Sequence, residues 1–457
     1  MMKYFRGFLL GGVYLVLCTP FLHAETLSEA VETTLATHPA ADGAQARVET
    51  SEQQRKAASS GFFPEISLST SAGREYADNS TSRGLSVSRG AGYSGLWEGS
   101  VSARQMLFDG METQSRVRAA RALQESAMLG VEDLREQLAM RTVQTYMNLL
   151  RTRKGLELLK GQEESVKSYL SRIKGMVDDG ASDEAELQQA RDVLSILENY
   201  KNDYDGQIKT LESDYFELTG RLPDGALSTP LPPVEALPPA LEEAVTLAKQ
   251  SHPVLKGAAF EVRAAQQNMK AEQGSLYPAV DGELSYAEVD KRDLIGGEST
   301  DAKAVVRMNW NLETGGGQLA RIREKASQKK EAESRVREME RRIERGVRQA
   351  YAEYETARNQ LKIQEQRADL NQKLLETYKS QFEGARITLL QLMQSDNQLL
   401  ITKLEKMNAE NRVHLAQYGI LAAVGRLQES LRAPPVKATI QAASEKVPVG
   451  INPQAKK

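Results

Sequence analysis

Residues Pro64-Glu65-Ile66-Ser67-Leu68-Ser69-Thr70-Ser71-Ala72 decide the fold, because serine alternates there with apolar or small side chains. A period of two residues predicts a β-strand, whereas the sequence before Pro64 has the 3.6-residue period of a helix. The same alternation recurs in three further stretches, at Trp97, Gly99, Val101 and Ala103, at Val280, Leu284 and Tyr286, and at Ala304, Val306, Met308 and Trp310. These stretches predict two β-hairpins, at about 65–108 and 279–312, each with one apolar and one largely polar face.

The length of these strands suits the membrane. Strands of about 10 residues can cross a bilayer when tilted, and apolar-out, polar-in alternation is typical of membrane barrels. Both tryptophans, Trp97 and Trp310, fall in this pattern, which favours a position at the membrane interface. A half-buried surface sheet in a soluble protein is the alternative. Since four strands leave two unpaired edges that lipid cannot satisfy, membrane strands would require several chains to share one barrel.

The N-terminus predicts export. Lys3 and Arg6 precede a short apolar run at 7–18, and the small residue Ala24 follows. This order is typical of a secretory signal peptide, so we expect residues 1–24 to be removed by cleavage after Ala24. The apolar run is too short to span a bilayer as a helix. A lipoprotein signal ending at Cys18 is the alternative.

Composition excludes several classes of protein. The 59 Lys and Arg residues nearly balance 62 Asp and Glu residues, so a nucleic-acid-binding protein with a basic face is not expected. Four histidines and one cysteine among 457 residues are too few for a zinc or iron–sulfur site or a disulfide framework. We therefore expect no cofactor and no metal.

The chain contains two similar halves. Residues 27–64 share 13 identities with the residues 214 positions later, including His38-Pro39 with His252-Pro253. Further along the offset is 205, where Gly220-Arg221-Leu222 matches Gly425-Arg426-Leu427. The predicted halves are 25–222 and 241–428, joined by a proline-rich linker at 223–240 that cannot be helical. A tail at 429–457 is expected to be disordered or to pack at mid-length, in an equatorial position.

Each half is predicted to begin with a helix, over Leu27–Ser60 and Leu241–Gly274. The His-Pro pairs predict a helix restart, with Thr37 and Ser251 as N-caps. A histidine ligand or catalytic pair is the alternative, although no acid or nucleophile accompanies it.

Long helical hairpins are predicted at 110–220 and 316–428. Steps of four and three residues predict left-handed coiled-coil packing in both halves. The heptad positions are Leu138, Thr142, Thr145, Leu149, Thr152, Leu156, Leu159, Glu163, Val166, Leu170, Ile173 and Val177 in the first half, and Ile343, Val347, Ala350, Tyr354, Ala357, Leu361, Gln364, Ala368, Asn371, Leu375, Tyr378 and Phe382 in the second. Glycines 180 and 384 are expected to stop the two long helices.

Together these features resemble the TolC family of outer-membrane channel-tunnels. The motifs that carry the resemblance are the junction Leu107-Phe108-Asp109-Gly110 and two turns, beginning Gly180-Ala181-Ser182-Asp183 and Gly384-Ala385-Arg386-Ile387. The resemblance implies a mainly α fold with membrane β-hairpins, in which a homotrimer closes a 12-stranded barrel in outer-membrane lipid. The barrel continues as a periplasmic tunnel of long coiled-coil helices. It also implies a periplasmic adaptor (a membrane fusion protein) and an inner-membrane ABC or proton-driven RND transporter. The His-Pro pairs and the Phe-Asp-Gly junction look most like the type I protein-secretion branch, with multidrug or solute efflux as the alternative.

The resemblance also assigns site residues at the helical tips. Arg386 matches the gate arginine of the family, and Glu186 matches an acidic partner on the other tip. Leu390 and Met393 occupy the positions where relatives carry cation-attracting aspartates that line the constriction. The sequence therefore leaves open whether this constriction selects cations, and a hydrophobic constriction gated by dewetting is the alternative. Gly180, Ala181, Gly384 and Arg386 match the adaptor-docking positions.

Two other classes of protein fit less well. An enzyme would need a clustered acid, base or nucleophile, and outside the signal peptide only His38, His252 and His414 are available as histidines. A periplasmic coiled-coil adaptor usually has one helical hairpin rather than two duplicated halves.

Overall fold

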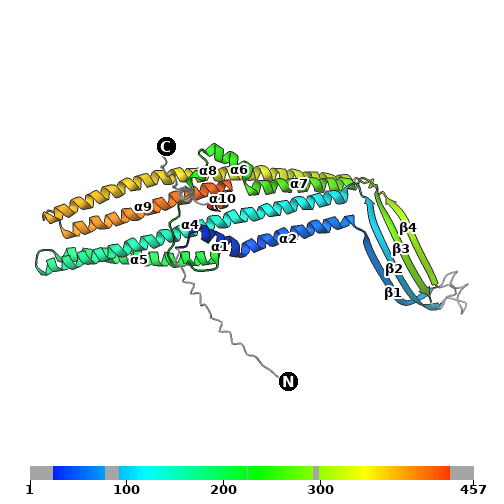
Figure 1. Ribbon diagram of the computed structural model, residues 1–457, viewed down its shortest axis with the longest axis horizontal. Helices are drawn as coiled ribbons and strands as arrows, with labels where there is room; N and C mark the ends of the chain where they lie inside the picture. Colours follow the sequence, from blue (N-terminus) through cyan, green and yellow to red (C-terminus); the bar gives the residue numbers. More distant parts are fainter. Residues whose placement is uncertain (1–23, 78–91, 224, 292–297, 433–457) are drawn as a thin grey trace, which may run out of the picture.

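The computed structural model describes residues 24–77, 92–223, 225–291 and 298–432. Over these ranges the chain is long and narrow, with a β-sheet at one end and the turns of two helical hairpins at the other (Figure 1). The predicted signal peptide lies outside the described residues except for Ala24, and residues 433–457 of the predicted tail also lie outside them. The expected fold class, mainly α with β-hairpins at one end, is confirmed.

Both halves have the same order of elements. The first comprises α1 (Leu27–Thr37), α2 (Pro39–Ser59), β1 (Glu65–Ala77), β2 (Gly92–Phe108), α4 (Glu112–Asp178) and α5 (Glu184–Thr219). The second comprises α6 (Leu241–Ser251), α7 (Pro253–Gly274), β3 (Ala279–Lys291), β4 (Glu298–Asn309), α8 (Gly317–Glu383) and α9 (Leu389–Val424). Short 3₁₀ turns lie at Ser60–Phe62 and Val234–Ala236, and α10 (Leu427–Arg432) follows α9.

The helix restarts occur where the His-Pro pairs predict them, but the capping residues differ from the expected ones. His38 caps α2, because its Nδ1 accepts the N–H of Ala40 at 3.1 Å. His252 caps α7 in the same way, with Nδ1 3.3 Å from the nitrogen of Val254. The expected caps Thr37 and Ser251 instead donate their hydroxyls to carbonyl oxygens four residues earlier, so they end the preceding helices.

The four strands form one antiparallel sheet in the order β1-β2-β3-β4. The hairpins of the two halves are joined through β2 and β3, where Val101 lies opposite Tyr286 and Ala103 opposite Leu284. The register shifts between Met106 and Phe108, close to the helices. Within the described residues β1 and β4 have a neighbour on one side only, so the sheet has two open edges.

The predicted heptad positions form the packing faces of the long helices. All twelve on α4 and all twelve on α8 are buried or half-buried. Those nearest the tips pack with α5 and α9 into one apolar cluster shared by both hairpins. It comprises Leu159, Val166, Ile173, Leu187, Ala190, Leu197, Leu375, Leu389, Leu390, Leu392, Met393, Leu399 and Leu400.

A second belt of core lies at mid-length, around α1, α6 and α10 (Figure 1). Tyr146, Tyr215 and Tyr418 are fully buried there. The carboxylate of Glu136 on α4 accepts the N–H groups of Leu427 and Gln428, at 3.0 and 3.1 Å, and so caps α10. Burial raises the pKa of Glu136, while these two N–H groups act against the shift.

The sheet meets the helices at a tight junction. Asp109 caps α4, since its carboxylate oxygens accept the N–H groups of Glu112 and Thr113 at 3.1 and 2.7 Å. Gly110 has a φ of +66°, and a Cβ there would lie 2.4 Å from the carbonyl oxygen of Gly274. Two backbones therefore touch at the base of the sheet, where no side chain fits.

Candidate functional site

One face of the sheet carries exposed apolar side chains on all four strands. Leu68 is 78% exposed and lies in register with Val101 and Tyr286. The exposed apolar band comprises Ile66, Leu68, Val101, Leu284, Tyr286, Val306 and Met308. A water-facing sheet would carry polar residues here, so this face is suited to contact lipid.

Exposed aromatic side chains flank this band at both ends. Tyr76 and Tyr93 pack together near the outer loops, with ring centroids 5.2 Å apart, and Trp97 follows. At the helix end Trp310 lies just beyond β4 and donates its Nε1–H to the carbonyl of Leu276 at 3.3 Å. Two aromatic belts around an aliphatic band are the pattern of a membrane-spanning sheet.

The opposite face of the sheet is polar and cross-braced by ion pairs. Arg104 binds Asp281 at 2.5 Å, and Arg307 binds Glu283 at 2.8 Å. Further from the helices the face carries small hydroxyls together with the charged residues Glu98, Asp301 and Lys303. The hydroxyls are Ser67, Ser69, Ser71, Ser100, Ser102, Ser285 and Ser299. Such a face can line a water-filled passage.

The first helical tip is the turn between α4 and α5. Gly180 has a φ of +71°, and the N–H of Ala181 donates to the carbonyl of Met176 at 2.7 Å, which closes the end of α4. Asp183 then caps α5 by accepting the N–H of Ala185 at 3.3 Å. Gly180 and Ala181, both expected docking residues, are exposed at this tip.

The second tip, between α8 and α9, is built differently from the expectation. The left-handed residue is Ala385, with a φ of +52°, whereas Gly384 has a φ of −82°. Thr388 and Gln391 form a capping box at the start of α9. Gly384 and Arg386 are exposed at this tip.

The four expected gate residues are not brought together within the chain. Glu186 accepts a hydrogen bond from the Ser182 hydroxyl on its own tip, at 2.5 Å, and does not pair with Arg386 in the described part of the chain. Met393 is 0% exposed and Leu390 7%, because both pack into the cluster shared by the hairpins. Within the chain these two side chains hold α9 against its neighbours, and their expected place at a constriction stays a prediction.

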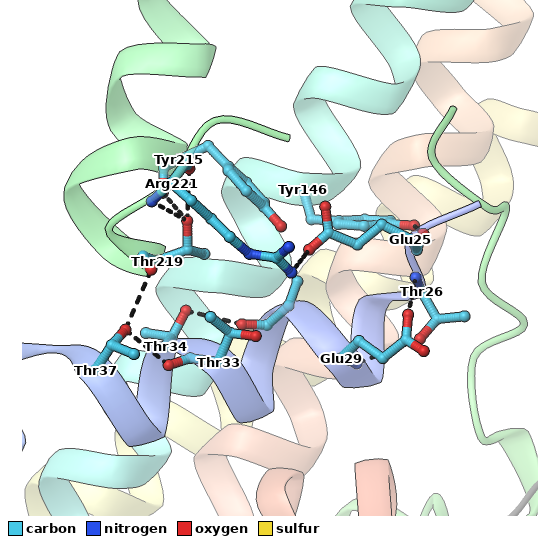
Figure 2. Close-up of polar contacts among 11 residues, drawn as sticks. Glu25, Thr26, Glu29, Thr33, Thr34, Thr37, Tyr146, Tyr215, Thr219 and Arg221 are labelled. Carbon is cyan, nitrogen blue, oxygen red and sulfur yellow. Dashed lines mark hydrogen bonds and ion pairs between the residues drawn. The ribbon is translucent and has the colours of Figure 1, made fainter. Parts of the chain in front are cut away.

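Sequence reasoning missed an ionic network at mid-length, built around the buried carboxylate of Glu25. Figure 2 shows Arg221, at the end of α5, reaching the carboxylate of Glu25, where the two atoms lie 2.6 Å apart. Glu25 is only 5% exposed, and the hydroxyl of Tyr146 lies 2.7 Å from the carbonyl oxygens of both Glu25 and Ser228. Burial raises the pKa of Tyr215 beside them. The network ties α1, α4, α5 and the linker together.

The repeat itself carried a signal for this network. Tyr146 matches Tyr351 and Arg221 matches Arg426 across the halves. Tyr351 likewise donates its hydroxyl to the linker, to the carbonyl of Pro238 at 2.6 Å. Repeated tyrosines at one level of a duplicated helix could therefore have marked the place where each half binds the linker.

Metal-binding clusters and membrane-spanning helices are both absent from the described residues. No group of three or more His, Cys, Asp or Glu side chains there is arranged to hold a metal ion. No helix in the described ranges is long and apolar enough to cross a membrane.

Comparison with known proteins gives a consistent result. A family model described as "Outer membrane efflux protein" matches residues 30–221 and 244–426, one segment in each half. The outer membrane efflux protein BepC of Brucella suis biovar 1 (strain 1330) is 25% identical over 330 residues, which are 72% of each chain. Among solved structures, the Campylobacter jejuni CmeC outer membrane channel is similar with a TM-score of 0.75 and 16% identity, over 93% of this chain and 90% of that one. The Vibrio cholerae outer membrane protein VceC is similar with a TM-score of 0.73 and 15% identity, over 87% and 96%.

Proposed function

The chain belongs to the outer membrane efflux protein family, and on that premise we propose that three copies form one channel that exports solutes from the periplasm. The observation that carries the proposal is a sheet with an exposed apolar face and two open edges, continued by a pair of 67-residue helices. At 1.5 Å per residue each helix is ~100 Å long. Such a chain supplies one third of a barrel wall and one third of a tunnel wall.

The open edges support assembly of several copies. Four strands cannot close, whereas the smallest membrane barrels have about eight. Three copies would provide twelve strands, with β4 of one copy beside β1 of the next. No unpaired strand edge would then face lipid.

The helices also carry a surface that a second copy would cover. Ile363, Leu370 and Leu374 are exposed on α8, spaced seven and four residues apart, and lie off its heptad face. Ile196 and Tyr200 are exposed on α5. Leu370 lies 13 residues before the end of α8, and Ile196 lies 12 residues after the start of α5, so the two stripes are level with each other. We propose that they pack together between neighbouring copies.

Assembly is tested by placing charges in the α8 stripe. The double variant Ile363→Asp/Leu370→Asp is expected to lose the trimer, measured as the mass of the detergent-extracted protein by native mass spectrometry. Asn359→Asp/Gln366→Asp is the matched control, because it adds the same two charges, also seven residues apart, on exposed polar positions of the same helix. An intact trimer in the double variant would contradict this interface.

For the cargo we propose small solutes rather than secreted proteins. The residues that suggested the secretion branch have local structural roles: His38 and His252 cap helices, and Asp109 caps α4. These capping roles do not by themselves favour a secreted protein, and the relative BepC is named an efflux protein. In a host lacking the gene, the two cargo classes separate directly. Efflux predicts increased sensitivity to toxic solutes, and protein secretion predicts a protein missing from the culture medium.

We propose that the exposed tip residues Gly180, Ala181, Gly384 and Arg386 receive a periplasmic adaptor, which connects the channel to an ABC or RND transporter in the inner membrane. Small residues at both turns allow close approach of another helical tip. Crosslinking from cysteines placed at Ala181 and Ala385 in whole cells would identify this partner.

At the same tips we propose a gate in which Arg386 binds Glu186 between neighbouring hairpins of the assembly. Arg386 is exposed, and Glu186 is held in place by Ser182. Leu390 and Met393 would support the gate through the core beneath it. Arg386→Glu is expected to raise single-channel conductance, and adding Glu186→Arg is expected to restore it. Unchanged conductance in Arg386→Glu would refute the pair.

A further inference from the structure

Two histidines occupy equivalent joints of the two halves. His38 separates α1 from α2, and His252 separates α6 from α7, 214 residues further on. Each uses Nδ1 to accept the backbone N–H two residues ahead. An imidazole nitrogen accepts a hydrogen bond only while it carries no proton, so both caps require the neutral side chain.

Each histidine also has a carboxylate close by on a neighbouring helix, near enough to interact with it electrostatically. Nε2 of His38 lies 3.5 Å from Oε1 of Glu217 on α5, and the other oxygen of Glu217 binds Arg141 of α4 at 2.9 Å. The side chain of His38 is 11% exposed. Because Nδ1 is the acceptor, neutral His38 carries its proton on Nε2, which already faces Glu217; protonation at Nδ1 would end the cap while Glu217 keeps the ring in the joint.

At the second joint, burial lowers the pKa of His252, while the negative charge of Asp133 on α4 acts in the opposite direction. Gly425, at the end of α9, packs directly on the joint and carries no charge. Glu136 of α4 is the next carboxylate, and the charges of Asp133 and of Glu429 on α10 both act to raise its pKa. The charged surroundings of both histidines are thus dominated by acidic groups on helices of the first half or on α10.

We propose that His38 and His252 are a pair of pH-sensitive joints, in which protonation releases the backbone N–H at the start of α2 and α7. Both helices run from the mid-length belt to the sheet (Figure 1). Acidification would therefore loosen the sheet-proximal half of the chain at two equivalent points. This inference goes beyond the proposed export function and does not depend on the cargo.

The direction of the pH effect on stability follows from the protonation of histidine in the folded and the unfolded chain. Histidine in an unfolded chain has a pKa of about 6.5. Because the fold favours neutral His252, the stability from its cap is complete above that pH and is lost as the pH falls below it. Burial raises the pKa values of Asp133 and Glu136, so these carboxyls act in the opposite sense. Variants at the histidines themselves are needed to separate the two effects.

Asparagine provides the decisive variant, since it caps helices well and does not titrate. Amide hydrogen exchange of the full chain in detergent, corrected for the intrinsic rate, would be compared at pH 7.5 and 5.5 over 38–44 and 252–258. The wild type is expected to lose protection about fivefold at the lower pH, and His38→Asn/His252→Asn is expected to keep it. His414→Asn is the matched control, because His414 is a half-buried histidine on α9 that caps no helix.

An alanine pair completes the test. His38→Ala/His252→Ala lacks both caps and should show the low-protection state at either pH. An equal pH response in the wild type and the asparagine pair would overturn the proposal. Full protection of the alanine pair at pH 7.5 would also overturn it, because the caps would then have no effect to lose.

Discussion

The two longest helices, α4 and α8, have the same length but very different surroundings. Each has 67 residues, yet 18 residues of α4 are buried and only five of α8. Helix α4 contacts α1, α2, α5, α7, α9 and α10, whereas α8 contacts α6, α7 and α9. The duplication therefore produced one helix that the chain encloses and one that it leaves largely uncovered. The uncovered helix is the one available to other copies.

The largest expected effect on stability comes from the same substitution, leucine to alanine, made on α4 and on α8. Leu159→Ala removes a fully buried side chain from α4 and should lower the free energy of unfolding by ~3 kcal/mol. Leu370 is 66% exposed on α8, so Leu370→Ala should change the oligomer mass before it changes helix content. Circular dichroism during denaturation and native mass spectrometry measure the two. Equal destabilisation by both variants would mean that α8 is as enclosed as α4.

The second comparison sets an ion pair with a buried carboxylate against a pair in which both side chains are exposed. Glu25→Gln leaves Arg221 without its buried carboxylate partner and should cost about 2 kcal/mol. Glu242→Gln is the control, because Glu242 and Arg348 form a surface pair worth well under 1 kcal/mol. Denaturant midpoints of the two variants should differ clearly. Similar midpoints would indicate that the mid-length network contributes no more than a surface pair.

The matched tyrosines sharpen the comparison between halves. Tyr146→Phe removes contacts with two carbonyl oxygens and should cost about 1.5 kcal/mol, whereas Tyr351→Phe removes one and should cost about 1 kcal/mol or less. Both substitutions keep the ring, so packing is preserved. A larger loss for Tyr351→Phe would reverse the ranking of the two halves.

The smallest expected effects are at the tips. Gly180→Ala places a Cβ on a left-handed residue and should destabilise the first turn by ~1 kcal/mol. Ala385→Gly should stabilise the second turn by ~0.5 kcal/mol, because alanine already occupies the left-handed position there. Melting curves of the two variants should shift in opposite directions. Shifts in the same direction would contradict the assigned turn geometry.

Periodicity predicted most of the fold, because heptads and alternating strands are local patterns that packing preserved. The heptad positions from Ile343 to Phe382 all lie on the packed face of α8. Contacts between distant segments could not be predicted in this way. Glu25 meets Arg221 across 196 residues, and nothing in either local sequence identifies the other.

The candidate site was predicted less completely, for two physical reasons. The resemblance assigned Leu390 and Met393 to a constriction, but a match of positions could not show that within the chain their side chains are buried between the hairpins; their place at a constriction stays a prediction. Thr37 and Ser251 are residue types that often cap helices. Their hydroxyls instead donate to carbonyl oxygens four residues earlier, and the histidines that follow them cap the next helices. The exposure of Gly180, Ala181, Gly384 and Arg386 places them at the surface of the tips, and their roles there stay predictions.

The backbone contact between Gly110 and Gly274 fixes the angle between the sheet and the helices. The helices that start there extend ~100 Å, so a tilt of ~1° at this point moves the distant tips by ~2 Å. A single added methyl group at this contact would therefore cause a displacement that grows along the helices and is greatest at their tips. Two glycines thus determine the direction in which the longest helices leave the sheet.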